Sequence, residues 1–366
     1  MNLRIPGPTP LPEAVLQATG QQMINHRGPE FVSLLREITA RLKAFFQTEG
    51  DVFILTASGT GGLEAALVNL LSPGDRVLAV SVGYFGDRFA RIAEAFGAQV
   101  TKLDFPWGEA ADPEIIRERL IAEPGFKLVL VTHNETSTGV TNDLAAIAEA
   151  VKISTSSVES SLGDGGPLLA IDAISSLGAI DLPMDEWGCD VVITGSQKAW
   201  MAPPGLAMVG VSRRAWLAVE RAESPRFYWD FRPLKTYAGR GQTPFTPALS
   251  ALYGLGRSLE LMAEEGLSNI FARHRRIGRY MREGIKALGL ELLADETHAS
   301  DTVTAVRVPS GVDGGELLAR LCEEYGVILG GGQGPLRGRI FRIGHMGYVS
   351  EADIDRVLEA LNSLVV

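Results

Sequence analysis

Two polar residues that could do chemistry follow short apolar runs in the middle of this chain. Asp172 ends the run 168–172, and Lys198 stands 26 positions further on, after the run 190–194. A lysine beside an apolar sheet edge can lose its charge by desolvation and become a nucleophile toward aldehydes. A buried carboxylate needs a cation or several donors, and a protonated pyridine nitrogen is one such cation. The simpler interpretations are a surface lysine and an aspartate that caps the next turn.

The segment Ser58-Gly59-Thr60-Gly61-Gly62 could hold a phosphate group. It follows an apolar run and opens a helix-like segment, so free backbone N–H groups and the positive end of the helix dipole would lie there. Glycine would let the backbone approach a ligand closely. Serine and threonine also cap helices routinely, and the segment is neither a Walker A loop nor GxGxxG. The motif alone therefore leaves both interpretations open.

The elements that must position these residues alternate along the chain. Apolar runs bounded by turn residues predict buried strands, and segments with helical spacing between them predict helices. Alternating strands and helices predict an α/β fold with a mostly parallel sheet flanked by helices, and ligands bind at the carboxyl ends of such strands. The predicted strands are 51–56, 76–80, 127–132, 168–172 and 190–194, and the first predicted helices are 61–71 and 87–96.

The chain changes character in two places and toward its end. A Ser/Gly-rich stretch at 154–166 predicts an exposed loop, and the Pro- and aromatic-rich stretch 224–247 predicts a long irregular segment. Two predicted helices and a small α+β unit follow. We therefore predict an N-terminal arm at 1–14, a large domain at 15–247 and a small C-terminal domain at 248–366.

Composition narrows the function classes. The chain has 366 residues, with 34 Lys and Arg against 44 Asp and Glu, which gives a net charge of −10. This balance argues against a general nucleic-acid binder. No stretch approaches the roughly 20 apolar residues of a membrane helix, and the scattered histidines predict no metal site. Two cysteines cannot form a disulfide scaffold, so we expect a cytoplasmic protein.

Beyond these patterns, the chain resembles the class V pyridoxal-phosphate aminotransferases, in particular the alanine–glyoxylate and serine–glyoxylate (serine–pyruvate) group. The resemblance covers nearly the whole chain and implies the fold of the aspartate aminotransferases. Five motifs in matching order carry it: His26-Arg27-Gly28-Pro29-Glu30-Phe31, Thr132-His133-Asn134-Glu135-Thr136-Ser137-Thr138-Gly139, Asp172-Ala173-Ile174-Ser175-Ser176-Leu177-Gly178, Gly195-Ser196-Gln197-Lys198 and Phe341-Arg342-Ile343-Gly344-His345-Met346-Gly347.

The resemblance implies a role for individual residues toward pyridoxal phosphate. Lys198 would form the Schiff base and move the proton, and Asp172 would keep the pyridine nitrogen protonated. Phe85 would stack on the ring, where many relatives carry tryptophan, and Thr136 would lie near its hydroxyl. The predicted phosphate ligands are Ser58, Gly59, Thr60 and Gln197.

The same resemblance assigns the substrate side and a partner subunit. Arg342 would clamp the α-carboxylate, because a guanidinium matches a carboxylate with two parallel hydrogen bonds. The backbone of Gly7 would help it. Thr243 and Thr246 would reach the phosphate of the neighbouring subunit in a homodimer, although both could simply belong to a polar loop that caps the next helix.

The function implied is transamination from a small amino acid, alanine or serine, to a 2-oxo acid such as glyoxylate or pyruvate. The chain shows no second arginine that is obviously dedicated to a side-chain anion, although Arg27, Arg232 or Arg240 could enter the site, so aspartate and aminoethylphosphonate are weaker donor candidates. Two other interpretations stay open, a soluble hydrogenase small subunit that acts as a partner protein and a pyridoxal-dependent lyase. Cys189 and Cys322 precede a strand and lie in a helix, respectively, which disfavours a desulfurase.

Overall fold

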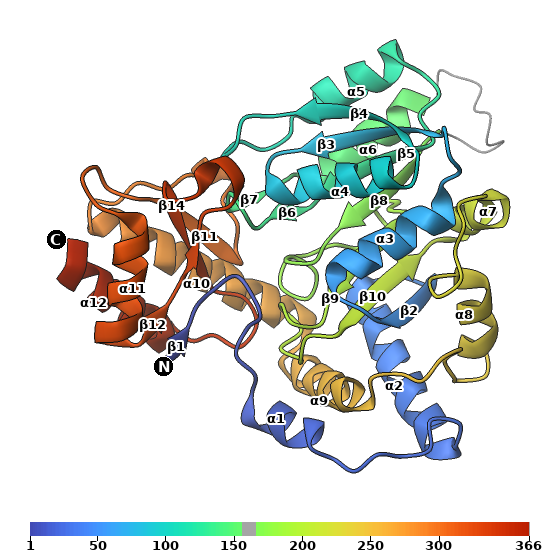
Figure 1. Cartoon of the computed structure of the whole chain (residues 1–366), viewed down its shortest axis with the longest axis horizontal. Coiled ribbons are helices and arrows are strands. Elements are labelled where there is room, and N and C mark those ends of the chain that lie inside the picture. Colours follow the sequence, from blue (N-terminus) through green and yellow to red (C-terminus); the bar gives the residue numbers. More distant parts are fainter. Residues whose placement is uncertain (156–165, 366) are drawn as a thin grey trace.

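The computed structural model describes residues 1–155 and 166–365 (Figure 1). Most of the predicted Ser/Gly-rich loop, residues 156–165, lies outside the described residues. A large sheet with its helices fills one side of the view, and a smaller unit that holds the C-terminal elements fills the other.

The large sheet has seven strands in the order β2-β10-β9-β8-β5-β3-β4. β10 runs antiparallel to its neighbours β2 and β9, and every other neighbouring pair is parallel. The prediction of a mostly parallel sheet is therefore confirmed. In sheet order the strands are β2 (Asp51–Thr56), β10 (Leu206–Val211), β9 (Val191–Gly195), β8 (Leu168–Asp172), β5 (Leu128–Thr132), β3 (Arg76–Ser81) and β4 (Gln99–Asp104).

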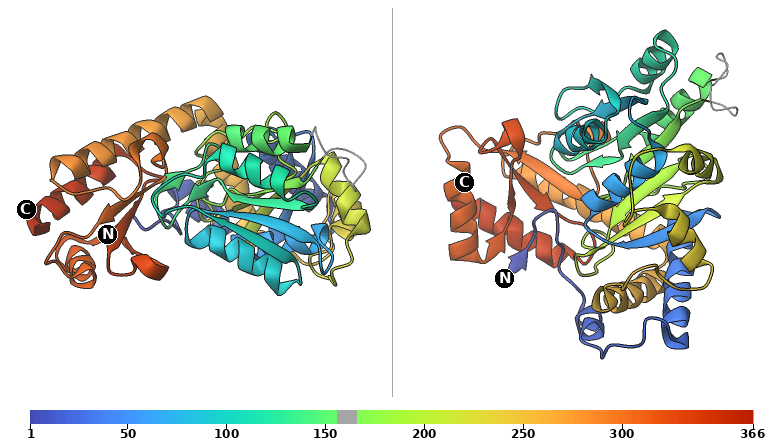
Figure 2. Two further views of the ribbon diagram at one scale, coloured as in Figure 1. Left: turned by 90° about the horizontal axis from the view of Figure 1, so that it is seen from above. Right: turned by 45° about the vertical axis from the view of Figure 1, so that its right-hand side comes forward.

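Helices cover both faces of this sheet (Figure 2). In β8, Leu168 and Ala170 join one hydrophobic core while Leu169 and Ile171 join the other, because successive side chains of a strand point to opposite faces. One core includes α3 (Gly59–Leu70), α4 (Tyr84–Ala95), α7 (Arg213–Arg221) and α8 (Phe231–Ala238). The other includes α2 (Pro29–Phe46), α5 (Pro113–Ala122), α6 (Leu144–Thr155) and α9 (Leu249–Glu265), and α1 (Glu13–Thr19) packs against α9.

The C-terminal elements form a separate core around a small antiparallel sheet of order β11-β14-β13. The first strand of the chain, β1 (Asn2–Leu3), pairs with β12 (Val327–Ile328) of this unit. The N-terminal arm is therefore tied to the far end of the sequence. The other elements are α10 (Leu267–Ala287), β11 (Val303–Arg307), α11 (Gly314–Tyr325), β13 (Gly330–Gly331), β14 (Ile340–Gly344) and α12 (Glu351–Val365), with the hairpin β6 (Asn134–Glu135) and β7 (Val140–Thr141) beside the large sheet.

The stretch 224–247 is not irregular throughout, so that prediction is wrong in part. Residues Phe231–Ala238 form α8, whose N-cap Asp230 accepts a hydrogen bond from the backbone N–H of Arg232. Pro233 lies in the first turn of the helix, where its missing N–H costs no hydrogen bond. The periodicity was hidden because this helix is only eight residues long.

Two further predictions can be compared with the structure. Helices α3 and α4 begin two and three residues earlier than predicted, so Gly59, Thr60 and Phe85 lie in first turns rather than in loops. The domain limits at residues 14 and 247 stay a prediction. None of the helices in the described part of the chain is both long and apolar enough to cross a bilayer.

Candidate active site

Asp172 and Lys198 lie at the same edge of the large sheet. β8 and β9 are parallel neighbours, Asp172 is the last residue of β8, and Lys198 follows the end of β9 by three residues. By strand alternation the side chain of Asp172 points to the face that α3 and α4 cover. Each of the two charges shifts the pKa of the other. An acid and an amine therefore share the carboxyl edge of the sheet.

The amine of Lys198 lies under the N-terminal arm. Its Nζ donates a hydrogen bond to the carbonyl oxygen of Pro6. A Cβ on Gly7 would lie 2.8 Å from Nζ, and Gly7 has a φ of +105°, so only glycine fits this position. Burial, and then the charge of Arg342, lower the pKa of Lys198 to about 8. About a tenth of this amine is therefore neutral at pH 7, far more than for an ordinary lysine.

Asp172 is buried, and its pKa lies near neutral pH. The residue is 3% exposed, and its Oδ1 accepts a hydrogen bond from the backbone N–H of Ile174 at 3.0 Å. Burial raises its pKa to about 7, while the charges of Lys198 and Arg88 act in the opposite direction. A cation facing this carboxylate would keep it ionised.

The N-terminus of α3 follows the carboxyl end of β2 and could receive an anion. Ser58 is the N-cap, and its Oγ accepts from the N–H of Gly61 at 3.4 Å, which is the simpler role considered for it. A Cβ on Gly59 would lie 2.5 Å from Cδ1 of Ile174, so glycine lets this turn approach the loop after β8. The first N–H groups of a helix have no acceptor within it. Nearby, the buried Oε1 of Gln197 has no hydrogen-bond partner among the described residues.

Glu135 holds the start of α4, which carries Phe85. The N-cap of α4 is Gly83, which has no side chain to cap the helix. The carboxylate of Glu135 instead accepts from the N–H groups of Phe85 and Gly86, each at 3.0 Å. A Cβ on Gly83 would lie 2.5 Å from Cγ of Glu135. The sequence analysis did not predict this role, although Glu135 lies between polar neighbours in the motif 132–139.

Arg342 reaches the same region from the C-terminal unit. It is 8% exposed, and burial lowers its pKa to about 10. Nε donates to the carbonyl of Gly331 at 2.9 Å, and Nη1 donates to the carbonyl of Thr136 and to Oε1 of Gln333, both at 3.2 Å. The hydroxyl of Thr136 itself donates to Oγ of Ser175 at 2.8 Å. Arg342 is thus fixed beside Thr136, with Nη2 making no hydrogen bond among the described residues.

Arg88 also belongs to this site, and sequence reasoning did not single it out. It lies one turn after Phe85 on α4, and its Nη1 donates to Oγ1 of Thr60 at 3.3 Å. Its charge lowers the pKa values of Asp172 and Lys198. The only signal in the sequence was its spacing of three residues from Phe85, which puts both on one helix face.

Thr243 and Thr246 are not brought to Lys198 within one chain. They lie in the loop before α9, which packs against β2 together with Tyr228 and Trp229. Oγ1 of Thr243 donates to the carbonyl of Phe245 at 2.7 Å, and Thr246 is exposed. No contact of the described residues joins either threonine to the site of Lys198.

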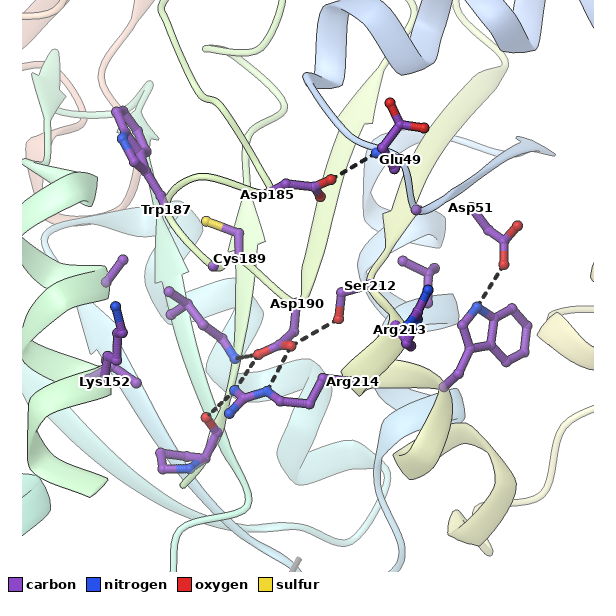
Figure 3. Close-up of a pocket in the computed structure, with 18 of the residues that line it drawn as sticks. Glu49, Asp51, Lys152, Asp185, Trp187, Cys189, Asp190, Ser212, Arg213 and Arg214 are labelled. Carbon is purple, nitrogen blue, oxygen red and sulfur yellow. Dashed lines mark hydrogen bonds and ion pairs between the residues drawn. The ribbon is translucent and has the colours of Figure 1, made fainter. Parts of the chain in front are cut away.

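A cavity of about 640 Å³ lies at the other end of the strands, where the parallel strands begin (Figure 3). Its walls include the starts of β2, β8 and β9. Asp190 in this cavity accepts from Ser212 Oγ at 2.9 Å and from Arg214 Nη2 at 2.6 Å, so its charge is already paired. This cavity is lined by none of the residues described around Lys198, so the chemistry of Lys198 does not take place there.

The residues around Lys198 fit pyridoxal phosphate. An amine and a carboxylate lie on neighbouring strand ends, an anion cradle lies beside them, and the aromatic ring of Phe85 is held at the same edge. The glycines at positions 7 and 59 leave room that a Cβ would fill. The unpartnered Oε1 of Gln197 offers an acceptor to a ligand hydroxyl or protonated phosphate.

Comparisons with known proteins point in the same direction. The profile of the family Aminotransferase class-V matches residues 1–357. A Synechococcus protein named soluble hydrogenase, small subunit, is 43% identical over 365 residues, which is 99% of this chain and 92% of that protein. The L-aspartate–glyoxylate aminotransferase of Paracoccus denitrificans is 41% identical over 95% of this chain and 87% of its own. The crystal structure of an alanine–glyoxylate aminotransferase from Nostoc superposes with a TM-score of 0.93 at 32% identity, over 100% of this chain and 95% of that one.

Proposed function

This chain belongs to the class V aminotransferases and is a pyridoxal-phosphate-dependent aminotransferase, and we propose that it moves an amino group from alanine or serine to glyoxylate or pyruvate. The observation that carries the proposal is the position of Lys198. Its amine follows the strand next to the one that ends at Asp172, and it is near enough to Asp172 and Arg342 for both charges to shift its pKa. An amine in that position can meet a substrate that Arg342 holds by its carboxylate.

Lys198 is the proposed nucleophile and proton carrier. Pyridoxal phosphate supplies an aldehyde that takes up and releases amino groups, and a ring that accepts the electron pair left at Cα. The Nζ of Lys198 would hold that aldehyde and, when a donor amine takes its place, would carry the proton between Cα and the aldehyde carbon. Its pKa of about 8 supports both tasks, because the amine must be neutral to attack and to accept a proton.

Asp172 is proposed to hold a proton on the ring nitrogen. The buried carboxylate would face the ring cation, and the opposite charge would lower its pKa from about 7 and keep it ionised. Phe85 would stack on the ring, and Thr136 would lie near the ring hydroxyl. In this proposal the phosphate binds at the start of α3, through Ser58, Gly59, Thr60 and Gln197.

Arg342 is the proposed clamp for the carboxylates of both substrates. Its Nε and Nη1 are held by carbonyl groups, which fix the plane of the guanidinium. A substrate carboxylate would bind at Nη2 and share Nη1, because such forks favour two parallel hydrogen bonds. Gly7, which lies against Lys198, would add its backbone to the same carboxylate.

The proposed functional unit is a homodimer. Among the described residues, neither Thr243 nor Thr246 contacts the site of Lys198, and exposed aromatic side chains lie beside them. Phe227 is 80% exposed, and the rings of Tyr228 and Phe245 stack at a centroid distance of 5.0 Å. A second copy that covers these rings would bring the two threonines to its own phosphate site.

The cysteines support a cytoplasmic location and argue against sulfur transfer. Cys189 and Cys322 are both free. Burial raises the pKa of Cys189, so its thiol is a poor nucleophile. Cys322 lies in α11, in the C-terminal unit. Free thiols persist in a reducing compartment, and we propose the cytoplasm for that reason.

Aspartate is the second candidate donor. The Paracoccus relative is named for aspartate, and Arg88 adds a second guanidinium near Lys198. A role as a hydrogenase partner, which the name of the Synechococcus relative raises, is less supported because Lys198, Asp172 and Arg342 are all present and the latter two are near enough to shift the pKa of Lys198.

A screen of single half-reactions tests the proposal. The holoenzyme is mixed with one amino acid at a time, without any acceptor, and its visible absorbance is followed together with 2-oxo acid release. Alanine or serine should shift the absorbance and release at most one equivalent of 2-oxo acid per site. Continued release without an acceptor would establish a lyase, and a shift with aspartate alone would replace the proposed donors.

A further inference from the structure

We propose that Arg88 binds the phosphate group of the cofactor and supplies its counter-charge, an inference that rests on the proposed function. Arg88 lies on the first turns of α4, with its guanidinium between two parts of the site. Nη1 donates to Oγ1 of Thr60 at 3.3 Å, and the guanidinium carbon lies 4.8 Å from the centre of the Phe85 ring. It thereby connects the predicted phosphate cradle with the predicted stacking ring.

Arg88 forms no ion pair in the described part of the chain, although its charge lowers the pKa of the more distant Asp172. Its neighbour Asp87 is engaged elsewhere, since Oδ1 accepts from Ser81 at 2.7 Å and pairs with Lys102 at 2.9 Å. Arg88 therefore keeps most of its five N–H donors for something other than a carboxylate of its own chain.

The position of this charge is unfavourable without an anion. Thr60 is the second residue of α3, so the guanidinium lies at the positive end of that helix dipole. A cation there is repelled by the dipole, and Lys198 lies close enough for Arg88 to lower its pKa. The guanidinium of Arg88 and the N-terminus of α3 meet at Thr60, and this combination of positive charge and free N–H groups favours an anionic ligand.

The other predicted phosphate ligands carry no charge. Ser58, Gly59, Thr60 and Gln197 offer hydroxyl, backbone and amide groups, and Thr243 and Thr246 of a second copy would add only hydroxyls. Lys198 is committed to the aldehyde. A phosphate monoester carries a charge of about −1.5 to −2 near neutral pH, and a guanidinium fork matches its oxygens. Arg88 is the cationic group that touches this cradle.

Arg88 could instead bind the side-chain carboxylate of a dicarboxylic donor, and the geometry disfavours that role. The substrate carboxylate is expected at Arg342, which is held by Gly331 and Thr136 of other elements. Arg88 is held at the start of α3, through Thr60. A small donor such as alanine needs no second guanidinium, so the phosphate role is consistent with the proposed substrates.

The test compares two ligands that differ only by the phosphate. The full-length chain is stripped of cofactor and titrated with pyridoxal phosphate and with pyridoxal, and binding is followed by absorbance and tryptophan fluorescence. Arg88→Gln should raise the Kd for pyridoxal phosphate by about 10- to 100-fold, because hydrogen bonds to a charged group are lost. The Kd for pyridoxal should stay within about twofold, as both ligands still react with Lys198.

Arg91→Gln is the matched control. Arg91 lies on the same helix, its guanidinium lies 5.5 Å from the Tyr84 ring, and it does not touch Thr60. Both Kd values should be unchanged in this variant. Arg88→Lys, which keeps the charge but loses the fork, should give an intermediate Kd for pyridoxal phosphate.

Three results would overturn the inference. The first is an unchanged Kd for pyridoxal phosphate in Arg88→Gln, the second is equal weakening of both ligands, and the third is a raised KM for aspartate with unchanged cofactor binding. Failure of the unaltered chain to bind either ligand at Lys198 would instead refute the proposed function. Thermal unfolding of each cofactor-free variant shows whether it is folded.

Discussion

Glu135 holds Phe85 through the backbone, since its carboxylate accepts from the N–H of Phe85 at 3.0 Å from an element far away in the sequence. Glu135 is fully buried, and Ser137 also donates to it through both its N–H and its hydroxyl. One carboxylate therefore replaces the missing cap of α4 and joins that helix to the hairpin that carries Thr136.

The first prediction concerns this cap. Glu135→Gln should lower the free energy of unfolding of the cofactor-free protein by about 1–3 kcal/mol, because an amide N–H₂ would face backbone donors in a buried site. Denaturant unfolding measures the loss. Glu94→Gln, an exposed position on the same helix, should leave the value unchanged. Equal unfolding midpoints for the two variants would contradict the assigned role.

The second prediction concerns the pH dependence of Lys198. Burial lowers its pKa from 10.5 to about 8, and only the neutral amine is nucleophilic. In cofactor-free protein, acylation of Lys198 should therefore rise with pH, reach half its maximum at about pH 8 and level off above it. Peptide mass spectrometry gives the rate. The acylation rate of a lysine in a free peptide, with a pKa of about 10.4, should still be rising with pH in this range. If the rate of Lys198 had the same pH dependence as that of the peptide, a lowered pKa would be excluded.

The third prediction concerns Asp172. Asp172→Asn should reduce kcat by about 100-fold or more while the variant still binds the cofactor, since removing one partner of a buried charge pair costs on the order of 3–5 kcal/mol. Steady-state turnover and the absorbance of the holoenzyme are measured together. The control is Asp181→Asn, because Asp181 is exposed and lies after β8, away from the site. Full turnover in Asp172→Asn would remove this residue from the site.

The fourth prediction concerns Arg342. Arg342→Lys should raise KM for both the amino acid and the 2-oxo acid by about 10- to 100-fold, because a lysine cannot form two parallel hydrogen bonds with a carboxylate. The kcat value should fall less. Arg339→Lys, an exposed arginine three residues earlier, should keep the KM values of the unaltered enzyme. A change in only one of the two substrates would show that Arg342 is not their common clamp.

The fifth prediction concerns the second copy. Lys198→Ala chains and Thr243→Ala/Thr246→Ala chains should each be impaired, the first in turnover and the second in cofactor affinity. Co-expressed, they should regain turnover at limiting cofactor, because a mixed dimer contains one site with Lys198 and both threonines. Light scattering should give the mass of two chains. Recovery without a dimer, or a dimer without recovery, would refute the shared site.

The edge of the sheet could be predicted from the sequence because the strands are short apolar runs with clear limits. β2 and β8 have the predicted bounds, since both runs end at polar turn residues. Asp172 and Lys198 follow such runs, so their shared edge followed from topology alone. No strand was predicted at 206–211, where β10 lies, or at 99–104, where β4 lies, because the first run is buried without alternation and the second is largely polar.

Contacts between distant elements were beyond the reach of sequence patterns. The capping of α4 by Glu135 joins positions about 50 residues apart, and only the folded chain shows that Gly83 leaves space for it. Arg88 differs from an ordinary helical arginine only through Thr60, which belongs to another helix. The N-terminal arm reaches Lys198 because β1 pairs with β12, a pairing of two-residue strands with no periodicity to detect.

The tight glycines around the site have a consequence for mutational tolerance. Gly7, Gly59 and Gly83 each lie so close to another residue that a single added methyl group would collide with it, at 2.8 Å or less. In a library screened only for the yellow colour of the bound vitamin, alanine should be depleted at these three positions. Such a map would outline the reaction centre before any substrate is known.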